Sequence, residues 1–133
     1  FSAYRFMKLT TDRWTPYEKV LRTMHNALVT VVPSRWQEPF GRVALESLMV
    51  GTPVVATRRG GLPEIVEDGK YGIHANPTLL SLMKALRVSI SKNKQLRQTI
   101  QLDQRLLVQK FAELPVSQHL ELYQGLLGKI RTT

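Results

Sequence analysis

The 133-residue sequence has no cysteine, three histidines and few acidic residues. Without cysteine the chain cannot form a disulfide or a thiolate metal site, which is compatible with a cytoplasmic location. The histidines, His25, His74 and His119, are too scattered along the sequence to indicate a metal centre, so no metal is expected. Acidic residues number 10 against 19 lysines and arginines, which leaves a net charge of +9.

This excess of positive charge favours a polyanionic partner, namely nucleic acid, an acidic membrane surface or a phosphorylated ligand. A solvated basic surface with no partner is the alternative interpretation. No recognised nucleic-acid-binding motif accompanies the charge, so nucleic acid is not expected. No apolar run is long enough to span a bilayer. Any membrane contact is therefore expected to be peripheral, at an inner face.

The hydrophobic pattern predicts an α/β fold. With 43% hydrophobic and 22% charged residues, the composition is that of a globular domain. Short β-branched or apolar runs alternate with helical periodicity, which is typical of a Rossmann-like open parallel sheet flanked by helices. The strands are expected at 28–33, 53–57 and 71–75, and the helices at 16–27, 41–50, 62–66, 79–90 and 96–111, with a last helix opened by Pro115 and carrying Leu120, Tyr123, Leu126 and Leu127.

The chain is expected to form a single, partial domain. Residues 1–15 have no clear period and are interpreted as an irregular lead-in; 16–77 form the α/β core and 78–133 a helical region. Thr15 is expected to cap the first helix, with Pro16 at its first position. Gly51 is expected to end the helix over 41–50.

Two glutamates stand out at the second of these helices. Glu38 lies on the loop before it, and Glu46 lies eight residues on, within it. Gly41 at the helix start lets a ligand approach the backbone, where free amides and the helix dipole favour phosphate. The two carboxylates are expected roughly 10 Å apart along the axis. That layout suits ribose, diphosphate and hexose, although two glutamates at this spacing also occur in helices with no ligand.

The residues around this pair carry a family resemblance. The stretch Glu38–Glu46 resembles the Glu-x7-Glu motif of the retaining glycosyltransferases of group 1, which have the GT-B fold. The segments Ser-Leu-Met-Val-Gly-Thr-Pro-Val-Val-Ala-Thr and Gly-Gly-Leu-Pro-Glu-Ile-Val-Glu-Asp-Gly follow in the family's order and spacing. The resemblance covers about residues 17–127 and implies the C-terminal, donor-binding half of such an enzyme.

The resemblance implies roles for particular residues. Glu38 would contact the hydroxyls of the donor sugar at the catalytic centre, and Glu46 would bind the ribose hydroxyls. The backbone amides of the donor site near the diphosphate would be those of Phe40, Gly41, Arg42 and Val43. A nucleotide-diphosphate sugar is the substrate, and no metal or other cofactor is implied.

Further residues are expected at the rim where the strands end, because ligands of open α/β sheets bind beyond the carboxyl ends of the strands. Arginines there either attract the phosphates or an acidic acceptor, or are solvated charges. The rim set is Ser34, Arg35, Arg58, Gly60 and Gly61.

Taken together, the sequence predicts the donor-binding part of a hexosyltransferase acting on a glycan, lipid or other acceptor. The N-terminal GT-B domain is an expected partner, the isolated chain is expected to be inactive, and its exposed interdomain surface favours self-association. The alternative is a non-catalytic module of the same fold that binds a protein or an anionic membrane.

Overall fold

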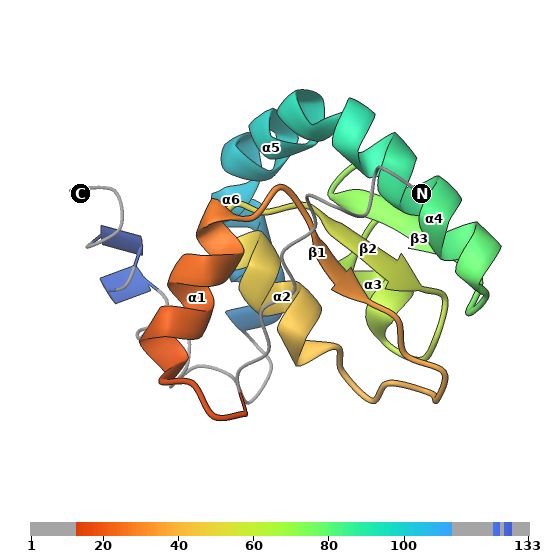
Figure 1. Ribbon diagram of the computed structural model, residues 1–133. Coiled ribbons are helices and arrows are strands. Elements are labelled where there is room, and N and C mark those ends of the chain that lie inside the picture. The colour runs from red at the N-terminus through yellow and green to blue at the C-terminus, as the bar shows by residue number, and fades with distance from the viewer. Residues whose placement is uncertain (1–12, 113–123, 126, 129–133) are drawn as a thin grey trace, which may run out of the picture.

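The computed structural model describes residues 13–112, 124, 125, 127 and 128 (Figure 1). Of the irregular lead-in expected over 1–15, positions 1–12 lie outside the described residues. Leu120, Tyr123 and Leu126 of the last expected helix also lie outside them. Gln124–Gly125 and Leu127–Gly128 are helical. No helix in the described part of the chain is both long and apolar enough to cross a membrane.

Strands and helices alternate through the first half of the chain, and helices follow. The elements are α1 (Tyr17–Asn26), β1 (Thr30–Val32), α2 (Arg42–Met49), β2 (Val54–Thr57), α3 (Leu62–Ile65), β3 (Gly72–Ala75), α4 (Leu79–Ser91), α5 (Asn93–Leu102) and α6 (Gln104–Ala112). The three described strands form a parallel sheet in the order β1-β2-β3. This is the predicted Rossmann-like open sheet; β2 and β3 are each one residue shorter than expected, and β1 is half the expected length.

Helices cover both faces of the sheet. Along β2, Val54 and Ala56 pack into a large core with α1, α2, α3, α5 and α6, whereas Val55 faces the other way and packs with α4. Figure 1 shows α4 on the flank of the molecule away from α1. All four residues of β2 are buried, which is why its sequence is continuously apolar rather than alternating.

Helix α2 begins and ends at glycines, close to the prediction. Gly41 is its N-cap with a φ of 80°, and a β-carbon there would lie 2.8 Å from Leu62 Cδ2. Gly51 follows the C-cap Val50 with a φ of 87°, so the predicted C-terminal glycine is confirmed. The helix therefore begins directly after the loop that carries Glu38.

The expected capping of α1 is wrong. The N-cap is Pro16 and not Thr15, the helix begins at Tyr17, and no side chain caps it. The carboxylate of Glu18 pairs with Arg22 at 3.3 Å, one turn further on, and adds a small local stabilisation to the helix.

The single helix expected over 96–111 is also wrong, because α5 and α6 are separated at Asp103. The Tyr71 hydroxyl donates to Asp103 Oδ2 at 2.9 Å, and Lys70 Nζ lies 3.1 Å from the same oxygen. The hydrogen bonds from Tyr71 and then from Lys70 hold the pKa of Asp103 below its ordinary value, whereas burial raises the pKa of Tyr71. This contact joins the helical region to the end of the α/β core.

Arg97 of α5 joins three segments of the fold. Its guanidinium donates to the carbonyl of Gly51 at 3.2 Å and to the carbonyl of Ala27, the residues that follow α2 and α1. Its Nε also donates to Asn93 Oδ1 at 3.1 Å. Burial lowers the pKa of Arg97. A cation at two helix C-termini complements both helix dipoles.

Candidate functional site

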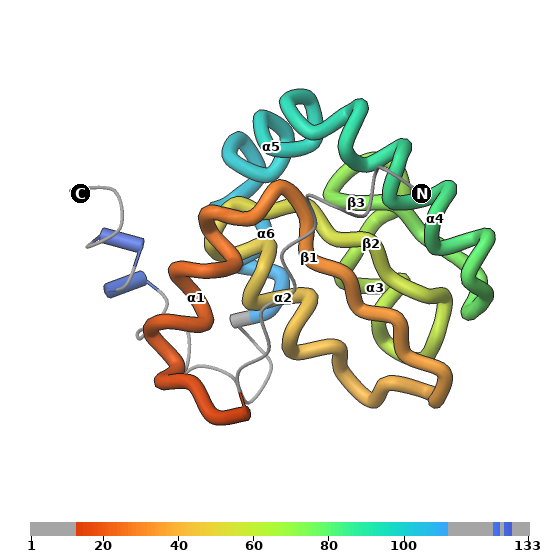
Figure 2. Tube along the Cα trace, viewed as in Figure 1, coloured from red at the N-terminus to blue at the C-terminus, as the bar shows by residue number. Residues whose placement is uncertain are grey.

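The loops that follow β1 and β2 lie side by side at the carboxyl edge of the sheet (Figure 2). The amide of Gly61 donates to the carbonyl of Glu38 at 2.7 Å, and the amide of Gly60 donates to Gln37 Oε1, also at 2.7 Å. Thr57 Oγ1 at the end of β2 donates to the carbonyl of Ser34 at 2.6 Å. The topology thus fixes the two predicted motif loops against each other, as parallel strands require.

The approach of these loops depends on glycine. Gly60 has a φ of 55°, and a β-carbon on it would lie 2.0 Å from the carbonyl oxygen of Glu38. At Gly61 a β-carbon would lie 3.1 Å from the carbonyl of Pro39. No side chain fits at position 60, so the geometry of the site requires glycine there, whereas position 61 is tightly packed.

The carboxylate of Glu38 is held by two donors from its own loop. Ser34 Oγ donates to Glu38 Oε2 at 3.4 Å, and Trp36 Nε1 donates to the same oxygen at 3.2 Å. Ser34 is buried and Trp36 is 65% exposed. Trp36 therefore orients the carboxylate from the solvent side, a role that its position in the sequence does not reveal.

A pocket of about 490 Å³ lies at these loops. This volume is in the range of small-molecule sites. Its wall includes Phe40, whose ring meets that of Phe111 edge to face with centroids 6.3 Å apart. The lining residues are Gln37, Glu38, Pro39, Phe40, Gly60, Gly61, Glu64, Ile65 and Phe111. A carboxylate and an apolar wall are thus brought together in one pocket.

The second glutamate occupies a different environment. Glu46 is buried in α2, and its Oε1 accepts from the Tyr17 hydroxyl and from Arg42 Nε, each at 3.0 Å. The arginine is one turn before Glu46 on the same helix, whereas Tyr17 comes from α1. Sequence reasoning missed Tyr17, since no local pattern links it to a residue 29 positions away.

The structure brings together some of the predicted residues and separates others. Glu38, Phe40, Gly60 and Gly61 line the pocket, whereas Gly41 and Arg42 begin α2 beside it. Glu38 precedes α2, so helical spacing applies only from residue 42 on, and the expected axial separation of the two carboxylates does not follow from it.

Three further predicted residues, two of the rim and one of the donor site, are exposed to solvent. Arg35 and Val43 are exposed, and Arg58 lies 4.0 Å from Asp68 with both side chains about half exposed. Among the residues that the structure describes, no group of three histidine, aspartate or glutamate side chains is placed to hold a metal ion.

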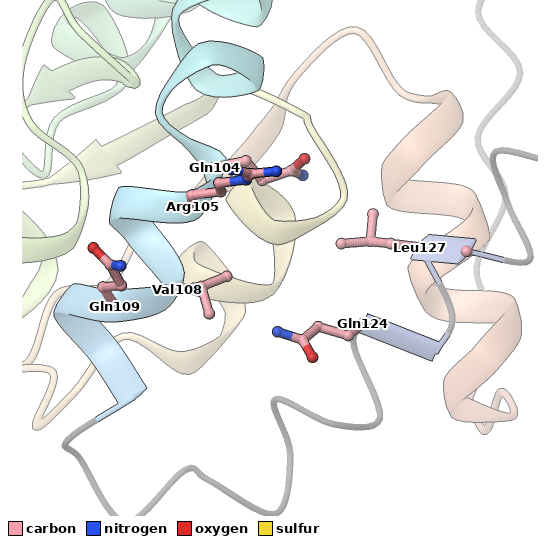
Figure 3. A pocket seen from close by; sticks show the side chains of 7 residues that line it. Gln104, Arg105, Val108, Gln109, Gln124 and Leu127 are labelled. Carbon is pink, nitrogen blue, oxygen red and sulfur yellow. The ribbon is translucent and has the colours of Figure 1, made fainter.

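A second hollow lies between α6 and the residues Gln124, Leu127 and Gly128 (Figure 3). Its volume is about 440 Å³, and Gln104, Arg105, Val108, Gln109, Gln124, Leu127 and Gly128 line it. Gln104 also donates to the carbonyl of Met49 at 3.0 Å. The lining holds amides and one arginine but no carboxylate, so it offers less acid–base chemistry than the pocket at Glu38.

The family can be assigned by comparison. A family model described as glycosyl transferases group 1 matches residues 12–104, which include both motif glutamates and both glycines. The chain belongs to this family. The α/β fold with its open parallel sheet agrees with a Rossmann-like half of the GT-B fold.

Individual relatives support the same assignment. An uncharacterized glycosyltransferase of Methanocaldococcus jannaschii is 39% identical over 63% of this chain and 24% of its own length. A D-inositol 3-phosphate glycosyltransferase of Thermobifida fusca is 52% identical over 44% of the chain and 13% of its own. A glycogen synthase of Mycobacterium tuberculosis is 43% identical over 46% of the chain and 14% of its own. The chain thus spans a quarter or less of the length of these curated relatives.

Proposed function

We propose that this group 1 glycosyltransferase chain binds the nucleotide-sugar donor of a retaining enzyme that transfers a hexose to a glycan, lipid or other acceptor. The observation that carries the proposal is the placement of two carboxylates around the start of α2. Glu38 lines the pocket just before the helix, and Glu46 is buried and held by hydrogen bonds one turn into it. The proposal includes a cytoplasmic location and a second GT-B domain that holds the acceptor.

The start of α2 is the proposed diphosphate site. The first amides of a helix have no acceptor within the helix, and together with the helix dipole they favour an anion. Gly41 is the N-cap, and no side-chain cap bonds to the first amides of α2. The amides of Phe40, Gly41, Arg42 and Val43 are the proposed contacts. They would stabilise the charge that develops on the leaving diphosphate.

Glu46 is the proposed ligand of the ribose. A carboxylate accepts hydrogen bonds from the two hydroxyls of a ribose. Tyr17 and Arg42 both donate to Oε1 and hold the carboxylate in place, which lowers the entropy lost when a ligand binds. Because the ribose is common to all these nucleotides, this contact does not select the base.

Glu38 is the proposed catalytic carboxylate. It would accept from hydroxyls of the hexose and, as a negative charge at the pocket, stabilise the positive charge that develops at the anomeric carbon. In the transfer, the bond from that carbon to the diphosphate breaks and the electron pair stays on the diphosphate. The acceptor hydroxyl bonds to the same face of the carbon and transfers its proton to the departing diphosphate. Ser34 and Trp36 keep the carboxylate in place through both steps.

Calorimetric titration of the chain with UDP, GDP and ADP tests the proposal. We expect saturable binding of one of the three, lost in Glu46→Gln. Glu38→Gln should bind the bare nucleotide like the parent and lose only the extra affinity for the nucleotide sugar. Glu67→Gln, a carboxylate paired with Lys70 and Lys110 away from the pocket, is the matched control. Binding of no nucleotide, or equal binding by Glu46→Gln, would refute the proposal.

A further inference from the structure

The outer face of α4 carries large apolar side chains that no described residue covers. Leu79 is 76% exposed, Leu80 64%, Met83 57% and Ile90 47%. Positions 79, 83 and 90 fall on one side of the helix by its period of about 3.6 residues. A hollow of about 290 Å³ is lined by Met83, Leu86, Arg87 and Ile90. We call the four exposed residues the α4 face.

This face is exposed because α4 buries only its opposite side. Ala85 and Ser89 are the buried residues of the helix, and they pack toward β2 and β3. Both are small, so the helix lies close to the sheet while its larger side chains point away. Apolar residues exposed in a row, rather than singly, mark an interaction surface.

The charge around the α4 face has one sign. From Gly69 to Leu102 the sequence contains no aspartate or glutamate. Lys84 and Arg87 lie on α4 itself, and Lys92 and Lys94 follow at its C-terminal end; all four are exposed. None of them forms an ion pair with an acidic residue in the described part of the chain. By helical position, Arg87 and Lys84 flank the apolar side chains along one edge.

An apolar stripe flanked by basic side chains, with no acidic residue nearby, complements the surface of an anionic bilayer. The apolar groups enter the boundary between headgroups and acyl chains, and the lysine and arginine stems extend to the phosphates. A protein partner would have to supply acidic groups along that one edge of an apolar ridge, whereas an anionic lipid surface presents both features over its whole area.

We propose that the α4 face docks on an anionic lipid surface. The proposal goes beyond donor binding and does not depend on it. Helix α4 starts just after the carboxyl end of β3, the same edge of the sheet that carries the pocket at Glu38. Docking through this helix therefore brings that edge, and Leu79 and Leu80 with it, next to the headgroups.

Vesicle co-sedimentation of the full chain tests this proposal, with phosphatidylcholine vesicles and with mixed phosphatidylcholine and phosphatidylglycerol vesicles. We expect binding to the mixed vesicles alone, weakened by salt. Lys84→Gln with Arg87→Gln should lower the partition coefficient about fivefold for each charge. Met83→Ser with Ile90→Ser should lower it by roughly tenfold for each side chain.

Matched controls separate the face from general charge and hydrophobicity. Arg13→Gln with Arg105→Gln removes two exposed arginines elsewhere, and Leu102→Ser with Leu106→Ser removes two exposed leucines. Both should bind mixed vesicles like the parent. All variants should keep the parent's circular dichroism and urea midpoint, because every altered side chain is exposed.

Three results would overturn the proposal. Equal binding to the neutral vesicles would remove the role of charge, and no binding to either kind would remove the lipid. A dimer in light scattering that Met83→Ser with Ile90→Ser abolishes, without vesicle binding, would assign the face to a second copy of the chain. Nucleotide titration of the Lys84→Gln, Arg87→Gln variant reports separately on the donor site, so failure of one proposal is distinguishable from failure of the other.

Discussion

Gly60 lies so close to Glu38 that a β-carbon on the glycine would stand 2.0 Å from the carbonyl oxygen of the glutamate. The neighbouring amide of Gly61 donates to that same oxygen at 2.7 Å. The backbone of Glu38 is thus clamped by the loop after β2, and its carboxylate can only take positions that this clamp allows. The glycine pair is therefore part of the site although it offers no side chain.

Gly60→Ala tests the clamp. The new methyl group meets the backbone nitrogen, carbon and oxygen of Glu38, so we expect a loss of about 3 kcal/mol or more in the free energy of unfolding and loss of nucleotide-sugar binding. Gly69→Ala is the control: Gly69 has a φ of 77° and open space around it, so it should lose only about 1–2 kcal/mol from backbone strain. Urea denaturation measures both. Equal losses of unfolding free energy in the two variants would show that the clash between the new methyl group and Glu38 does not destabilise the fold.

Tyr17→Phe tests whether the bond to Glu46 serves binding. Removing a donor to a buried carboxylate should lower the free energy of unfolding by about 1–2 kcal/mol and the nucleotide affinity by about tenfold. Tyr71→Phe removes the bond to Asp103 and should lower stability alone. Parallel urea and calorimetric titrations separate the two effects. A Tyr17→Phe variant that is less stable but binds normally would make Tyr17 purely structural.

The strand and helix pattern of the core could be predicted because each signal is local. The β-branched runs around β1 and β2 are buried strands, and the glycines that bound α2 stand next to the residues that they terminate. The break at Asp103 could not be predicted. Leu96, Ile100, Leu107 and Phe111 keep a helical period across it, and all four are buried. The break is associated with a contact to Tyr71, which lies 32 positions earlier in the chain.

Asp103 also predicts a pH dependence. Its pKa is below the ordinary value in the folded protein, so the pairing with Tyr71 and Lys70 stabilises the fold at pH values above the unfolded pKa of about 4 and is lost as the pH falls through the lower, folded value. Between pH 6 and pH 3, the urea midpoint of Asp103→Asn should therefore fall less than that of the parent. Glu64→Gln corrects for the loss of one carboxylate. An equal fall in Asp103→Asn and the parent would contradict the pairing.

Arg97→Met tests the link between α5 and the ends of α1 and α2. Two carbonyls lose a charged donor, so we expect a loss of about 2–3 kcal/mol in the free energy of unfolding. Arg97→Lys should recover only part of it, because an ammonium group cannot fork toward both carbonyls. Gln98→Met, an exposed neighbour on α5, should change the urea midpoint little. If Arg97→Met is as stable as Gln98→Met, the two carbonyl contacts contribute nothing.

For the site, the sequence located the motif but not its supports. Glu38, Gly60 and Gly61 meet at one pocket because of the strand order: their two loops follow β1 and β2, which are parallel neighbours in the sheet. Tyr17 and Gln37 were missed because their partners lie in other segments, at Glu46 and Gly60. Distances between segments depend on how the helices pack, which periodicity alone does not specify.

The two sides of the sheet differ in how much they bury. On the α4 side the buried cluster consists of Val55, Ala75 and Ala85, whereas the other side packs leucine, isoleucine, methionine and aromatic side chains from five helices. Unfolding α4 alone therefore exposes little apolar surface, and this layer should open more readily than the rest. In native-state hydrogen exchange, the amides of α4 should exchange first and those of β2 and α2 last, so the chain can loosen at one flank while the loops at Glu38 stay closed.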